Sequence, residues 1–175
     1  AEVRFHEIGR HWSQDPVLIR QREEEKLYEG LGVSDERMAQ LKTTWGPGFS
    51  PDPDGKWAVV SYWTGTSSND VWVMDLGEWF RTGEMSLKPI VIGEEGRNAA
   101  TVHGNAVYMQ TYLGAPNGKI VKIDPFNPEK ENWVEVVPHR SEAILRGYSI
   151  AHGRIASSYL FDASTRIELA DLNGK

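Results

Sequence analysis

The chain has 175 residues, 39% hydrophobic and 25% charged, which is enough apolar material for one folded domain and argues against disorder. Its formal net charge of −6 provides no basic field for nucleic acid or anionic lipid, and no apolar run approaches the roughly 20 residues of a membrane span. The absence of cysteine excludes disulfides, thiolate metal sites and a cysteine nucleophile, and it fits a reducing, cytoplasmic location. We expect no nucleic-acid partner, no membrane partner, no metal and no cofactor.

The chain begins without Met on a strand-like segment and has no signal-peptide pattern, so we expect a processed or truncated end. Residues 1–21 are predicted to form the outer two strands of one β-sheet. Residues 22–45 then carry two helical patterns, at 23–28 and 34–41. Ser34 is suited to the N-cap of the second, with two acidic residues in the first turn. We interpret residues 22–45 as a helical insertion.

From residue 46 onward the sequence repeats with a period of about 49 residues. Each unit has a turn glycine before an apolar stretch, at intervals of 49: Gly55, Gly104 and Gly153. An aspartate closes the next apolar stretch, at intervals of 49 and 47: Asp75, Asp124 and Asp171. About four short antiparallel strands in each period are typical of a β-propeller blade. A β-sandwich also has many short strands, but it does not predict a constant period.

The predicted fold class is therefore all-β: a partial β-propeller of about three to three and a half four-stranded antiparallel blades. Residues 1–21 supply the outer strands of one blade, and the helical insertion follows at residues 22–45. Two blades occupy residues 46–95 and 96–143, and residues 144–175 form the first three strands of another. Such an arc leaves open blade edges, which predicts self-association through strand pairing.

Several motifs along the chain resemble one family in their order and spacing. Residues 3–9 read VRFHEIG, residues 114–116 read GAP, and residues 123–125 read IDP. A tryptophan then precedes VVP at 136–138, and the last motif is YLFDAST at 159–165. Together these are similar to the propeller of the prolyl oligopeptidase family, over almost the whole chain except residues 22–45.

This resemblance implies a seven-bladed propeller that caps an α/β-hydrolase domain, whose Ser-Asp-His triad lies C-terminal to the propeller. Relatives cleave short peptides after proline, and the propeller restricts access of larger substrates. The implied partners are a C-terminal catalytic domain and short peptides. The resemblance also makes the loop at residues 112–114 a candidate to approach the catalytic domain.

Residues that suggest chemistry are better explained by structure. Ser149 lies in GYSIA, which lacks the second glycine of a nucleophile elbow and falls on a predicted strand. His6 and His11 are five residues apart on a strand-like segment, whereas a helical zinc motif needs a spacing of four. Asp52 and Asp54 lack the later ligands of a calcium loop and suit a plain turn. We predict no catalytic or metal-binding residue.

Four residues near the inner strands are candidates to face a central tunnel: Arg97, Asn98, Arg146 and Tyr148. Their alternative role is to satisfy backbone groups at blade ends. Three tryptophans in predicted strands are expected to pack between sheets: Trp57, Trp72 and Trp133. Trp12, Trp63 and Trp79 lie near loops.

Three functions remain open at this point. The chain is an access-restricting segment of a serine peptidase without its own catalytic triad, a standalone propeller scaffold for protein–protein interaction, or an enzyme in its own right, such as a propeller glycosidase. Two carboxylates such as Asp75 and Asp124 would carry the last function. Their common position in the repeat favours a structural role instead.

Overall fold

The computed structural model describes residues 1–44 and 46–175, apart from the side chain of Glu24. Residue 45, the last of the predicted insertion, lies outside the described residues. The chain divides into two compact units, residues 1–93 and 94–175. No described helix is long and apolar enough to cross a membrane.

The first unit begins with a two-stranded antiparallel sheet, β1 (Glu2–Arg4) and β2 (Val17–Arg20), whose connection holds a short 3-10 helix at Trp12–Gln14. Two short helices follow, α1 (Glu24–Tyr28) and α2 (Asp35–Leu41). The Ser34 side chain accepts a hydrogen bond from the Arg37 backbone N–H, as the predicted N-cap requires. Both predicted helical segments are therefore present.

A four-stranded antiparallel meander completes the first unit, in the order β3-β4-β5-β6. Its strands are β3 (Gly46–Pro51), β4 (Trp57–Trp63), β5 (Asn69–Asp75) and β6 (Leu87–Val91), with α3 (Leu76–Thr82) between the last two. Three residues of the insertion are buried in the apolar cluster of this unit: Leu27, Tyr28 and Leu41. They pack there with Ile19 of β2 and with Val60, Trp72 and Met74 of the meander. The insertion thus contributes to the core of the first unit.

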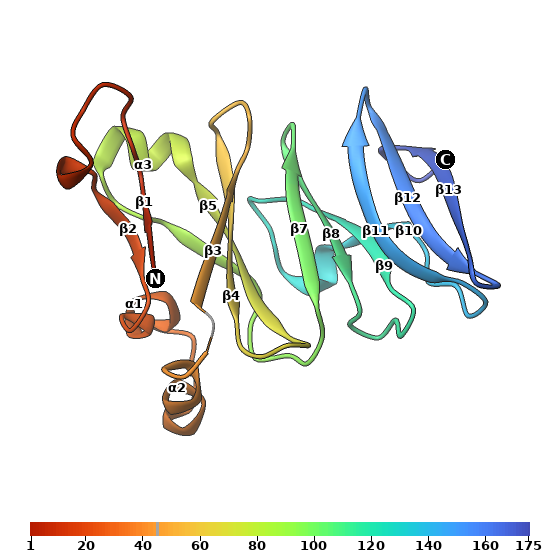
Figure 1. Ribbon diagram of the computed structural model, residues 1–175, viewed down its shortest axis with the longest axis horizontal. Coiled ribbons are helices and arrows are strands. Elements are labelled where there is room, and N and C mark those ends of the chain that lie inside the picture. Colours follow the sequence, from red (N-terminus) through yellow and green to blue (C-terminus); the bar gives the residue numbers. More distant parts are fainter. Residues whose placement is uncertain (45) are drawn as a thin grey trace. The chain divides into compact units, whose positions relative to one another are not determined.

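The second unit contains two antiparallel sheets (Figure 1). The first has the order β10-β9-β8-β7 and comprises β7 (Asn98–His103), β8 (Ala106–Thr111), β9 (Lys119–Ile123) and β10 (Val134–Val137). The second is the three-stranded meander of β11 (Ile144–Ala151), β12 (Arg154–Phe161) and β13 (Ser164–Asp171). Tyr108 and Ile120 of the first sheet pack with Leu145, Ile155 and Tyr159 of the second.

The repeat follows from the turns that join strands. Gly55, Gly104 and Gly153 have φ of 70°, 60° and 71°, a left-handed conformation that glycine adopts without a steric penalty. The expected all-β, partial-propeller class is confirmed by sheets of two to four antiparallel strands.

Two details of the strand prediction were wrong. Helix α3 was not predicted, because Asp75 was interpreted only as the end of a strand. Its carboxylate accepts a hydrogen bond from the Glu78 backbone N–H at 2.8 Å and so starts a helix. Trp133 was placed in a strand, but it ends a 3-10 turn and its indole donates to the Pro128 carbonyl at 2.9 Å.

Candidate functional site

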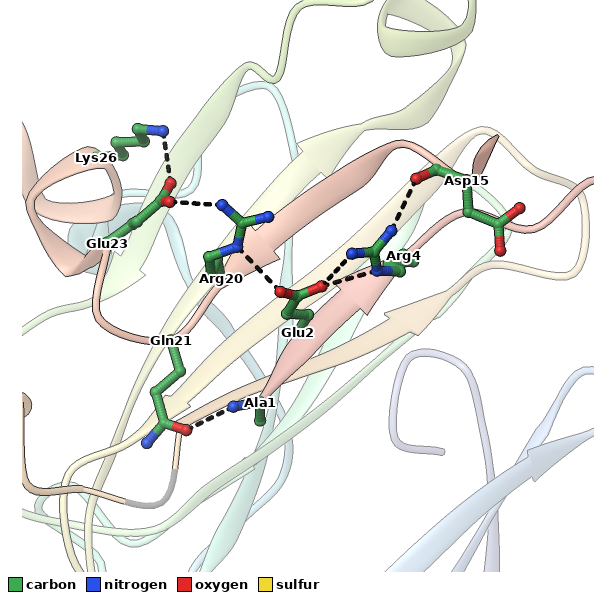
Figure 2. A network of polar contacts seen from close by, with 8 residues as sticks. All are labelled: Ala1, Glu2, Arg4, Asp15, Arg20, Gln21, Glu23 and Lys26. Atoms are coloured by element: carbon green, nitrogen blue, oxygen red, sulfur yellow. Dashed lines mark hydrogen bonds and ion pairs between the residues drawn. The ribbon is translucent and has the colours of Figure 1, made fainter. Parts of the chain in front are cut away.

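A chain of ion pairs joins the two-stranded sheet of the first unit to the start of α1 (Figure 2). The Glu2 carboxylate accepts from Arg4 at 2.7 Å and from Arg20 at 3.1 Å. The Glu23 carboxylate accepts from Lys26 at 2.6 Å and from Arg20 at 3.0 Å. The Arg4 hydrogen bond lowers the pKa of Glu2, and the Lys26 hydrogen bond lowers that of Glu23. All these groups are reached by solvent, so the network orients the segment more than it stabilises it.

Asp70 of β5 is a fully buried carboxylate that ties both insertion helices to the four-stranded sheet. It accepts hydrogen bonds from the Tyr28 hydroxyl at 2.6 Å and from the Gly93 backbone N–H at 2.8 Å, and it pairs with the Arg37 guanidinium at 3.2 Å. Burial, reinforced by the charge of Asp70, raises the pKa of Tyr28 well above its ordinary value. The Tyr28 hydroxyl therefore remains a donor, and the buried charge has three partners from separate segments.

The position of Asp70 determines which end of the sheet the insertion covers. Gly46 pairs with Trp63, and Trp63 pairs with Asn69, so the start of β3, the β4–β5 turn and the start of β5 lie at one end. Val71 pairs with Val91, which brings the end of β6 to the same place. Tyr28 and Arg37 of the insertion bind Asp70, which follows Asn69 at the start of β5, so the insertion is fixed at this end of the sheet.

Asn98 and Arg97, two of the tunnel candidates, lie at the start of β7. The buried Asn98 accepts from the Thr111 hydroxyl at 2.7 Å and donates to the Gly96 carbonyl at 3.0 Å. Arg97 is exposed, and its carbonyl accepts from the Tyr112 backbone N–H at 3.3 Å. These contacts give both residues a role at the blade end, and their exposure to a tunnel stays a prediction.

Tyr148 and Arg146, the other two candidates, lie on β11. The Tyr148 hydroxyl donates to the Tyr108 carbonyl at 2.6 Å and also lies 3.3 Å from the Ala99 carbonyl. Burial raises the pKa of Tyr148, so its proton stays on the hydroxyl. Tyr148 thus links β11 to the neighbouring sheet of the same unit. Arg146 is exposed beside the irregular pairing between Leu145 and Gly147.

The end of β8 and the β8–β9 loop make a second link between these two sheets. The Gln110 amide and the Tyr112 hydroxyl each donate to the Leu145 carbonyl at 2.9 Å. The Asn117 amide donates to the carbonyls of Arg140 at 2.8 Å and Ser141 at 2.9 Å. Neutral donors from one sheet therefore bind backbone carbonyls on or before β11. The predicted approach of residues 112–114 to a catalytic domain is not tested by these contacts.

Two of the three repeated aspartates act as turn formers, while Asp75 starts α3. Asp124 accepts from the Phe126 backbone N–H at 2.9 Å, and Asp171 accepts from the Asn173 backbone N–H at 2.8 Å. Ser149 lies within β11 and pairs with Ala156, so it does not sit on a strand-to-helix elbow. His6 lies 3.0 Å from the Asp15 carboxylate. Across the described residues, no group of three or more His, Cys, Asp or Glu is arranged to hold a metal.

Comparison with known proteins identifies the family. A family model described as the prolyl oligopeptidase N-terminal β-propeller domain matches residues 1–175. The chain belongs to the prolyl oligopeptidase family. This agrees with the resemblance in the motifs and with the meander sheets.

Individual members of the prolyl oligopeptidase family agree with this result. Prolyl endopeptidases of Elizabethkingia meningoseptica and Elizabethkingia miricola are 27% and 25% identical over 175 residues, covering 99% of the chain and 21% of each relative. A structure from a study of two prolyl endopeptidases and their inter-domain dynamics has a TM-score of 0.80 at 26% identity, covering 99% of the chain and 22% of its own. Prolyl oligopeptidase B of Galerina marginata has the same fold, with a TM-score of 0.74 at 22% identity over 98% of the chain and 22% of its own. The chain thus spans about a fifth of these relatives.

Sequence reasoning missed the residues that make the strongest ties in this propeller segment. None of Asp70, Gln110 and Asn117 was predicted from the sequence to make a contact of this kind. The side-chain partners of Asp70 lie 42 and 33 residues away, and the carbonyls that Gln110 and Asn117 bind lie 23 to 35 residues away. One available signal was the position of Asp70 and Gln110 inside or beside apolar strands, where a polar side chain needs a partner.

Proposed function

We propose that the chain is part of the access-restricting wall of a prolyl oligopeptidase-type serine peptidase. It limits entry to an active site carried by a C-terminal α/β-hydrolase domain, and it admits short peptides that are cleaved after proline. The chain itself forms no bond with the substrate. The observation that carries this proposal is the match of all 175 residues to the N-terminal propeller domain of the family.

The internal ties support a restricting role. A wall excludes large substrates only if its blades keep their spacing, since loose blades would let longer chains pass. In the second unit, Tyr148 and Gln110 join neighbouring sheets by donating to the backbone carbonyls of Tyr108 and Leu145. In the first unit, Asp70 fixes the insertion to the end of its sheet.

The catalytic part of the proposal is tested on the chain alone. A chromogenic peptide ending in Gly-Pro should show no turnover above buffer, while an active prolyl endopeptidase cleaves it under the same conditions. Turnover by the purified chain that is lost in Asp124→Asn or Asp75→Asn would contradict the proposal and support an independent enzyme.

The restricting part is tested in a longer protein that contains this chain and a catalytic domain. The double variant Tyr148→Phe/Gln110→Ala should raise kcat/KM for a peptide of about 30 residues relative to a short peptide, because it removes two neutral links between blades. Tyr159→Phe, on the same sheet, is the matched control. An unchanged ratio in a variant whose Tm has fallen would contradict the restricting role.

A further inference from the structure

A cavity of about 300 Å³ lies in the first unit, between the first helix of the insertion and the outer strands β5 and β6. Lys26 and Glu29 line it and are exposed, so their charges lie toward solvent. The volume is at the lower end of the range for small-molecule pockets, roughly 300–1,000 Å³. The other lining side chains are apolar or aromatic: Leu27, Leu31, Trp72, Met85, Leu87 and Pro89.

This cavity does not arise at an end of the chain. Its lining residues lie between positions 26 and 89, inside the first unit. The sheet that forms one wall has the four strands of a complete blade, β3 to β6. Leu27 of α1, which forms another wall, is 4% exposed and belongs to the apolar cluster of the same unit. The space therefore belongs to a complete blade and the insertion that packs on it.

Trp72 brings an unsatisfied donor to this cavity. Its side chain is 1% exposed, and its indole N–H has no hydrogen-bond partner among the described residues. The neighbouring Tyr28 ring packs edge-on against Trp72 with 5.1 Å between centroids, but the Tyr28 hydroxyl is bonded to Asp70. An indole nitrogen only donates, and a buried donor without an acceptor is costly. Trp72 therefore retains a hydrogen bond for an acceptor placed in the cavity.

The composition of the lining favours an organic molecule over a trapped water. A buried water is usually held by about two to four polar partners, whereas an apolar cavity stays dry. Among the lining side chains, the Trp72 indole is the one that is both polar and buried. An apolar molecule with one acceptor satisfies this donor and also covers the half-buried side chains of Leu31, Met85 and Leu87.

We propose that this cavity binds a small, neutral, mostly apolar molecule whose carbonyl oxygen accepts a hydrogen bond from the Trp72 indole. The molecule is neutral because an ionic group would lose its hydration among these side chains and find no buried charge to pair with. Bound there, it contacts α1 and β6 together and so ties the insertion to the blade. The proposal does not depend on the peptidase assignment, because it rests only on the cavity and its donor.

The test is a titration of the purified chain with cyclohexanone, a neutral ring with one carbonyl oxygen, followed through the indole N–H signals in ¹H–¹⁵N NMR spectra. Cyclohexanone should bind saturably and shift the Trp72 signal more than the signals of the other tryptophans. Methylenecyclohexane has nearly the same shape without an acceptor. It should bind about three- to tenfold more weakly, because one neutral hydrogen bond is lost. Equal affinities for the two probes would overturn the proposal.

Three variants separate the cavity from the fold. Trp72→Phe identifies the signal by removing it, and it should lower the affinity for cyclohexanone to that for methylenecyclohexane. Leu31→Trp keeps the donor but fills the cavity, so it should abolish binding of both probes. Ile8→Trp adds a similarly large side chain at a position that is 95% exposed in the same unit, and it should leave binding unchanged. Circular dichroism checks folding; if Trp72→Phe does not fold, Leu31→Trp and the probe pair still decide.

The same titration in a longer protein that contains this chain and a catalytic domain should give an unchanged affinity. Loss of binding there would overturn the proposal, because another segment would then cover the cavity. No binding of cyclohexanone by the wild-type chain, or binding that survives Leu31→Trp, would also overturn it.

Discussion

The two compact units hold their parts together by different chemistry. In the first unit, the buried carboxylate of Asp70 is bound by a guanidinium, a hydroxyl and a backbone N–H. In the second, neutral side chains such as Tyr148 and Gln110 bind backbone carbonyls of a neighbouring sheet. A buried charge that loses a partner costs far more than a carbonyl that loses a neutral donor, because the charge cannot be left unsolvated. The stability of the insertion should therefore depend on a few residues, and the stability of the contact between the two sheets of the second unit should be spread over many.

The largest expected effect follows from removing the buried charge. Asp70→Ala leaves Tyr28, Arg37 and the Gly93 N–H without their acceptor, and it should lower the free energy of unfolding by about 3–5 kcal/mol. Urea unfolding followed by tryptophan fluorescence measures this. Asp54→Ala, at an exposed turn of the same unit, is the control and should change stability by no more than about 0.5 kcal/mol. Equal effects of the two substitutions would show that the buried charge of Asp70 does not stabilise the first unit more than an exposed turn residue does.

A smaller effect is expected at the neutral link of the second unit. Tyr148→Phe deletes the donor to the Tyr108 carbonyl and should cost about 1 kcal/mol. Tyr159 provides a matched control in the same unit, since its buried hydroxyl has no hydrogen-bond partner among the described residues. Tyr159→Phe should therefore be close to neutral. A loss of several kcal/mol in Tyr148→Phe would show that the stability of this link depends on a single residue, as it does at Asp70.

The smallest effect belongs to the half-exposed pair of Arg140 and Glu168. The Arg140 hydrogen bond lowers the pKa of Glu168, so the pair stabilises the fold at pH values above the ordinary pKa of a carboxyl group. This contribution is lost as the pH falls through the lowered pKa. Glu168→Gln should cost about 0.2–1 kcal/mol at neutral pH and nothing in acid. Thermal unfolding at both pH values checks this, and a cost that persists in acid would contradict the assigned cause.

Turn chemistry made the propeller period predictable, whereas the ties between segments were not. Gly55, Gly104 and Gly153 must adopt positive φ, and this local requirement is visible in the sequence. Asp75 and Asp124 occupy the same position in the repeat, but only Asp75 starts a helix. Its carboxylate accepts a hydrogen bond from the Glu78 backbone N–H three residues later, whereas Asp124 accepts from the Phe126 N–H two residues later in a turn. Asp70 was not recognised, since its burial depends on Tyr28 and Arg37 and emerges only when the chain is folded.

The most direct test makes one substitution in both units. Tyr28→Phe removes a hydroxyl from a buried carboxylate, and Tyr148→Phe removes a hydroxyl from a backbone carbonyl. Because hydrogen bonds to charged groups contribute about 1.5–3 kcal/mol and neutral ones about 1 kcal/mol, the first substitution should cost more. Native-state hydrogen exchange of β5 and β11 amides measures both losses in their own units. A larger loss at Tyr28 is predicted, and an equal or larger loss at Tyr148 would contradict the proposed difference between the two units.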